Sequence, residues 1–146
     1  MLAGRRTLAL DWGKARIGLA ITDESGAYVQ TLPTLHRKNR ATDLGELSRI
    51  IADNGVSTLV VGAPLHLDGN VSPSSSQAEQ LGRTLAKRCG IELVLWDERL
   101  TSVEAEEILS ARGGKRKPGD VDRVAAALIL QSYIENGPAT AGGGLR

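Results

Sequence analysis

The sequence predicts an α/β fold built on a mixed five-stranded sheet. The first part of the chain alternates short apolar strands with turn signals, as an antiparallel meander does. The middle of the chain has a strand, helix, strand order, which is typical of parallel pairing. The 146 residues suffice for one domain with one hydrophobic core. Hydrophobic residues make up 41% and charged residues 24%, which excludes a disordered chain.

Three strands open the predicted fold. The first covers residues 7–12 and the second covers residues 16–23. A serine-glycine turn signal separates the second from a third strand over residues 27–35. Proline cannot donate to a sheet ladder, so Pro33 predicts that this third strand ends nearby or lies at an edge of the sheet.

An amphipathic helix follows, because apolar residues recur at helical spacing and a glycine stands at the C′ position. These residues are Leu44, Leu47, Ile50, Ile51 and Gly55. A strand over residues 57–62 and a second helix come next. The inner face of that helix comprises Ala78, Leu81, Leu85 and Cys89, of which Cys89 is expected to be a buried core residue. Residues 91–96 are almost all apolar, as in a parallel strand covered on both faces.

Two further helices complete the prediction. A capping box at Thr101 starts a short helix that stops at Gly113. The last helix runs from Asp120 or Asp122 to Asn136. Its inward residues are expected to be Val121, Val124, Ala125 and Leu128. Residues 1–136 are predicted to form a single domain, and residues 137–146 a flexible tail.

Composition and charge exclude several classes of protein. The net charge of +1 gives no global basic field, and positive charge is bunched in two acid-free runs, residues 37–40 and 112–117. Such short runs are usually solvated loop charge. A single cysteine, Cys89, excludes an internal disulfide and a cysteine-rich metal site. Since no apolar run is long enough for a bilayer or a signal peptide, we expect a cytoplasmic protein with no membrane partner.

Acidic residues stand at the ends of three predicted elements. Asp11 ends the first strand, Asp97 and Glu98 follow the fifth, and Asp122 begins the last helix. Ligands gather at the carboxyl ends of parallel strands, so these acids could form an oxygen-ligand set suited to Mg²⁺ or Mn²⁺. Each acid also has a structural explanation, because a hairpin turn or a helix N-terminus favours the same residue types.

Other chemistry has little support in the sequence. No Walker A loop, nucleophile elbow or dinucleotide fingerprint is present. His36 and His66 have no ligand-spaced partner and are expected at the surface or in loops. With only two tryptophans, two tyrosines and no phenylalanine, an aromatic platform for single strands is improbable, which leaves contact with the nucleic-acid backbone through lysine and arginine.

Four motifs, in order along the chain, resemble the YqgF family of ribonuclease-H-like proteins, which are related to RuvC. They are Leu8-Ala9-Leu10-Asp11-Trp12-Gly13 with Arg16-Ile17-Gly18-Leu19-Ala20, Val61-Gly62-Ala63-Pro64 with Asp68-Gly69, Asp97-Glu98-Arg99-Leu100-Thr101, and Val121-Asp122 with Ala125-Ala126 and Ile129-Leu130-Gln131. Ser102 and Ala63 depart from the usual family residues, and neither change touches an acid. The resemblance implies a ribonuclease-H-like sheet with helices on both faces.

The resemblance also implies a metal-dependent nuclease that matures the 5′ end of pre-16S ribosomal RNA. The family was formerly assigned to Holliday junction resolution, so branched DNA is the alternative substrate. Catalytic and metal-binding roles fall on Asp11, Glu98 and Asp122, and whether Asp97 or Glu98 faces the metal stays open. The expected cofactor is Mg²⁺ or Mn²⁺.

Nucleic-acid contacts are expected from basic residues near these acids. They are Lys14, Arg16, Arg99, Lys115, Arg116 and Lys117. Arg99 could equally hold the carboxylates in place by ion pairing. The small ribosomal subunit is a further expected partner, and the chain is expected to be a monomer or homodimer.

Two other functions are compatible with parts of the sequence. The first is an ATPase of the actin and Hsp70 type, whose domain also begins with an aspartate and a glycine at its first hairpin. That class needs a duplicated domain to enclose ATP, and this chain is long enough for one copy only. A nucleic-acid-binding or ribosome-binding factor that keeps the fold without turnover is the rival outside enzymology.

Overall fold

The computed structural model describes residues 6–63, 73–97 and 120–136. Its elements, in chain order, are β1 (Arg6–Trp12), β2 (Arg16–Thr22), β3 (Val29–His36), α1 (Arg40–Asn54), β4 (Val56–Ala63), α2 (Pro73–Cys89), β5 (Glu92–Asp97) and α4 (Asp120–Asn136). Three predicted features lie outside these residues. They are the short helix that starts at Thr101, the loop position of His66, and the flexible tail. None of the described helices combines the length and apolar content of a bilayer-spanning segment.

The five strands form one mixed sheet with the order β3-β2-β1-β4-β5. β1, β2 and β3 pair antiparallel, whereas β1 with β4 and β4 with β5 pair parallel. The predicted meander followed by parallel strands is therefore confirmed. β3 begins two residues later than expected and includes Pro33, and it occupies an edge of the sheet as that proline predicted.

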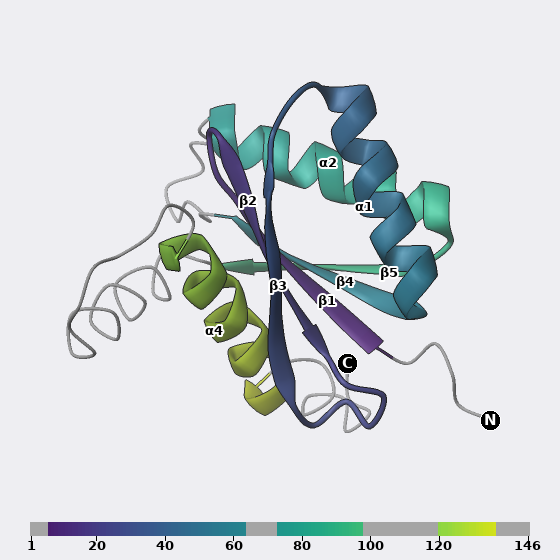
Figure 1. Ribbon diagram of the computed structural model, residues 1–146, viewed down its shortest axis with the longest axis vertical. Coiled ribbons are helices and arrows are strands. Elements are labelled where there is room, and N and C mark those ends of the chain that lie inside the picture. Colours follow the sequence, from purple (N-terminus) through teal and green to yellow (C-terminus); the bar gives the residue numbers. More distant parts are fainter. Residues whose placement is uncertain (1–5, 64–72, 98–119, 137–146) are drawn as a thin grey trace.

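Helices cover both faces of the sheet (Figure 1), with α1 and α2 on one face and α4 on the other. Alternation along β1 explains this arrangement, because successive side chains point to opposite faces. Leu8 and Leu10 pack in the cluster with α1 and α2, whereas Ala9 packs in the cluster with α4. Both clusters contain fully buried residues, so the sheet has a core on each side.

Local signals define both ends of α1. The side chain of Asn39 caps its N-terminus by accepting a hydrogen bond from the Thr42 backbone N–H at 2.8 Å. Gly55 ends it in the left-handed region, at φ 64°. α1 therefore begins at Arg40, so the basic run over residues 37–40 leads directly into the helix rather than forming a free loop.

The buried face of α4 differs from the predicted one. Its fully buried residues are Ala125, Ala126, Ile129 and Leu130, whereas Val124 and Leu128 are half-buried. The prediction is therefore confirmed for Ala125 and wrong for Val124 and Leu128, and the side chain of Val121 lies outside the described residues. Residues 124–130 are apolar throughout, so periodicity alone does not select a face. The expected inner face of α1 is confirmed except for Ile50, which is half-buried. Cys89 is also half-buried and packs against the core rather than inside it.

Candidate active site

Asp11 lies near the carboxyl end of β1 and is nearly buried, with 8% of its surface exposed. By alternation it shares the α4 face of the sheet with Ala9. Its partners in the neighbouring strands are Gly18 of β2 and Gly62 of β4, so no side chain projects beside the carboxylate from either position. The backbone of Asp11 therefore pairs with both neighbouring strands of the sheet.

The carboxyl ends of β4 and β5 reach the same edge of the sheet. Asp11 is in register with Gly62, and Gly62 is in register with Trp96. Asp97, the last residue of β5, therefore lies one position beyond the level of Asp11 along the strands. This placement of strand ends is the one that the sequence predicted.

The third predicted acid is in the first turn of α4. Asp122 precedes Ala126 by one helical turn, and Ala126 packs in the same cluster as Ala9 of β1. α4 runs opposite to β1, so its first turn lies toward the carboxyl end of that strand (Figure 1). The backbone thus brings position 122 to the same face and the same end of the sheet as Asp11.

The remaining predicted site residues are described in part. Lys14 is exposed in the turn after β1, and Arg16 is half-buried at the start of β2. Outside the described residues lie Glu98, Arg99, Lys115, Arg116 and Lys117, as do the side chains of Asp97 and Asp122. Within the described part of the chain, no three His, Cys, Asp or Glu side chains gather into a metal-sized group.

Sequence reasoning missed the role of Arg37 beside this site. Its guanidinium lies over the Trp12 ring, 3.9 Å from the ring centroid, and donates to the backbone carbonyls of Gly13 and Lys14 at 2.8 Å each. A cation over an aromatic face is attractive, and the two hydrogen bonds fix its position. Arg37 therefore holds the hairpin that follows Asp11. The only signal for Arg37 in the sequence was its place in the acid-free basic run over residues 37–40.

Comparison with known proteins agrees with this arrangement. The profile of the family described as RuvX, Holliday junction resolvase, matches residues 5–136. The chain belongs to the RuvX family. This membership confirms the family predicted from the four motifs. Two RuvX relatives, both named as proposed pre-16S rRNA nucleases, come from Koribacter versatilis and Syntrophus aciditrophicus. They are 45% and 42% identical over 132 residues, which is 89% of this chain and 86% and 88% of theirs.

Solved structures with the same fold include resolvases. RuvC of Thermus thermophilus, in complex with a Holliday junction substrate, has a TM-score of 0.59 at 11% identity and covers 90% of this chain and 96% of its own. The fowlpox virus resolvase with its junction DNA has a TM-score of 0.55 at 11% identity, covering 90% and 97%. At such identity the likeness establishes the fold of this RuvX chain, which is the RuvC-like mixed sheet.

Proposed function

We propose that this chain is a metal-dependent nuclease that hydrolyses phosphodiester bonds, with the 5′ end of pre-16S ribosomal RNA as its substrate. The observation that carries the proposal is Asp11, a nearly buried carboxylate between two glycine positions at the carboxyl edge of the sheet, in a member of a nuclease family.

The donor set suits a hard divalent cation. Asp11, Glu98 and Asp122 would supply carboxylate oxygens, the ligands that Mg²⁺ and Mn²⁺ prefer. Divalent cations held in this way supply activation of the attacking water and stabilisation of the leaving oxygen. The task of this chain's residues is to fix the ligand positions: β1 carries Asp11, Glu98 follows the last residue of β5 in the sequence, and α4 carries Asp122.

Basic residues would hold the substrate around these acids. Lys14 and Arg16 follow Asp11 on the same hairpin, and Arg99 follows Glu98, so each would contact the scissile phosphate or its neighbours. The run Lys115, Arg116 and Lys117 would follow the backbone farther away.

The side chains of both candidate acids after β5 lie outside the described residues. The resemblance to the family assigns the catalytic role to Glu98, so we infer that Glu98 rather than Asp97 binds the metal.

This inference predicts different effects for two matched variants. Glu98→Gln should lower cleavage by about 10²-fold, roughly 2.7 kcal/mol of transition-state stabilisation, whereas Asp97→Asn should stay close to wild type. Single-turnover rates of both variants with Mg²⁺ measure the difference. A large loss in Asp97→Asn with little change in Glu98→Gln would reverse the assignment.

Pre-16S RNA is the favoured substrate because the relatives named for it share over 40% identity across most of the chain. The alternative, branched DNA, is supported by the family description and by distant folds bound to junctions. A cytoplasmic location, association with the small ribosomal subunit and a monomeric or homodimeric state belong to the same proposal.

A nuclease assay tests the proposal directly. The purified chain is incubated with RNA spanning the 5′ end of pre-16S and with four-way junction DNA, in Mg²⁺, in Mn²⁺ or in chelator. We expect cleavage of the RNA that chelator abolishes. Preferential cleavage of the junction would favour the alternative, and binding without cleavage of either would identify a non-catalytic factor.

A further inference from the structure

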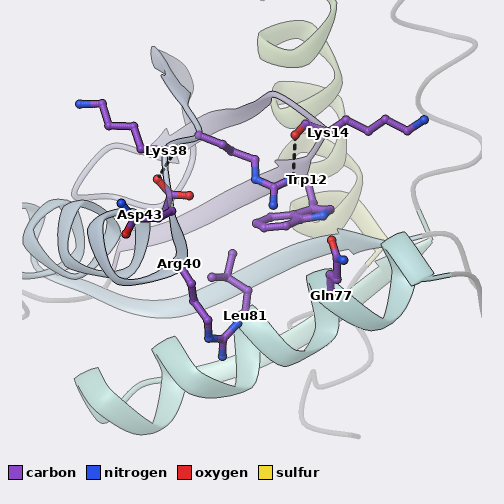
Figure 2. Close-up of a pocket in the computed structure, with 9 residues that line it drawn as sticks. Trp12, Lys14, Lys38, Arg40, Asp43, Gln77 and Leu81 are labelled. Atoms are coloured by element: carbon purple, nitrogen blue, oxygen red, sulfur yellow. Dashed lines mark hydrogen bonds between the residues drawn. The ribbon is translucent and has the colours of Figure 1, made fainter.

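A second basic site lies on the face of the sheet opposite to Asp11. A pocket of about 360 Å³ opens between the β1–β2 hairpin, the start of α1 and α2 (Figure 2). Four cationic side chains line it together with the apolar side chains of Trp12 and Leu81. The cations are Lys14, Arg37, Lys38 and Arg40.

The charge of this pocket is unbalanced. Among the residues that the structure describes, Asp43 is the only acid that lines the pocket, and this buried carboxylate already accepts the backbone N–H of Lys38 at 3.0 Å. Glu46 is the next acid along α1, and a hydrogen bond from Arg49 is the main reason that its pKa is lowered, with a smaller contribution from Lys38. Among the described residues no carboxylate forms an ion pair with the ammonium of Lys14 or Lys38.

Two of the four cations are held in place by the fold. Arg37 is fixed over Trp12 by the contacts given above, and its Nε is buried without a hydrogen-bond partner in the described part of the chain. Arg40 donates to the hydroxyl of Thr84 at 3.1 Å, which ties the start of α1 to α2. The cations of this pocket repel one another, so their arrangement destabilises the folded chain unless a bound anion neutralises them.

We propose that this pocket binds backbone phosphates of the substrate strand outside the scissile bond. The side chains of Lys14 and Lys38 extend to opposite sides of the pocket (Figure 2), so they are spaced along a path rather than aimed at one point. That spacing fits successive phosphates of a strand better than it fits a single small anion. Lysine and arginine contacts to phosphates fix the register of nucleic acid without reading its sequence.

The pocket is next to the candidate active site along β1. Trp12 directly follows Asp11 in β1, and the two side chains point to opposite faces of the sheet. A strand with its scissile phosphate at Asp11 would therefore pass over the carboxyl edge of β1 to reach the pocket. This inference rests on the proposed function, because it takes the ligand of both sites to be the same strand.

Salt-dependent binding tests the inference without requiring cleavage. The probe is a short fluorescein-labelled single-stranded RNA, titrated with the full chain in chelator and followed by fluorescence anisotropy. The test variant is Lys38→Gln with Arg40→Gln. The control is Lys87→Gln with Arg88→Gln, an equal change of charge at two exposed positions in the last turn of α2 that do not line the pocket. Circular dichroism verifies that each variant is folded.

Each lost phosphate contact lowers the slope of log K against log salt by about 0.7 for single strands, so the test variant should lose about 1.4. Between about 50 and about 200 mM salt, the affinity ratio of wild type to test variant should then fall about sevenfold. The control should keep the wild-type slope. An unchanged slope in the test variant, or an equal loss in the control, overturns the inference.

Two further outcomes separate this inference from the proposed function. A mononucleotide can be added at the same total phosphate concentration as the RNA. If it displaces the RNA, the pocket binds a single phosphate group, and the proposal that it binds successive phosphates of a strand is wrong. If wild-type chain binds neither RNA nor junction DNA, the proposed function itself fails. If wild type cleaves the RNA and the test variant has an unchanged salt slope, the proposed role of the pocket is rejected and the proposed nuclease function stands.

Discussion

Asp11→Asn is expected to lower metal-dependent cleavage by at least about 10³-fold while the chain stays folded. The substitution removes a charged ligand and keeps nearly the same shape. A metal ion contributes several kcal/mol of transition-state stabilisation, and each 1.36 kcal/mol corresponds to a factor of ten in rate. Single-turnover cleavage of the RNA with saturating Mg²⁺ measures the loss, and circular dichroism measures the fold.

A matched control separates this effect from loss of charge in general. Asp53→Asn makes the same chemical change at an exposed position of α1, where only an ion pair with Arg49 is lost. It should cleave at the wild-type rate. The Asp11 variant should be at least as stable as wild type, since crowded acids at functional sites often reduce stability. Equal cleavage by wild type and the Asp11 variant would point to a contaminating nuclease or to the non-catalytic factor.

The sheet could be predicted from the sequence because its signals are local. Alternation of apolar residues, a turn signal and Pro33 were enough to identify the meander and its edge strand. The carboxyl ends of β1 and β5 then followed from a general property of parallel strands. The buried face of α4 could be predicted only in part, because residues 124–130 are all apolar and their periodicity does not separate the half-buried Val124 and Leu128 from the buried residues.

The basic pocket could not be predicted because it depends on contacts across the chain. Residues 37–40 look like loop charge until Arg37 is seen to lie over Trp12, 25 positions earlier in the sequence. Nothing in the spacing of Arg40 indicates its contact with Thr84 on another helix. Local patterns therefore predicted the acids at strand ends, whereas the second basic site required the tertiary arrangement.

Ala126→Leu is expected to destabilise the fold by about 3 kcal/mol, the upper part of the usual range for overpacking a core. Ala126 is fully buried against Ala9 and Ala20, so three additional carbon atoms have no space between α4 and the sheet. For a chain of this size the midpoint of thermal unfolding should fall by roughly 6–12 °C. Thermal unfolding followed by circular dichroism measures this shift.

The same variant should cleave about 10²-fold more slowly at temperatures where it is still folded. Small side chains allow α4 to lie close to β1, and that distance sets where position 122 stands relative to Asp11. A displacement of about 1 Å in a catalytic group can cost 10²-fold in rate. Glu135→Leu introduces the same residue at an exposed position of α4, where it removes a hydrogen bond from Gln131, and it should retain both stability and cleavage. A folded Ala126 variant with wild-type cleavage would show that the spacing between α4 and β1 does not position the third acid.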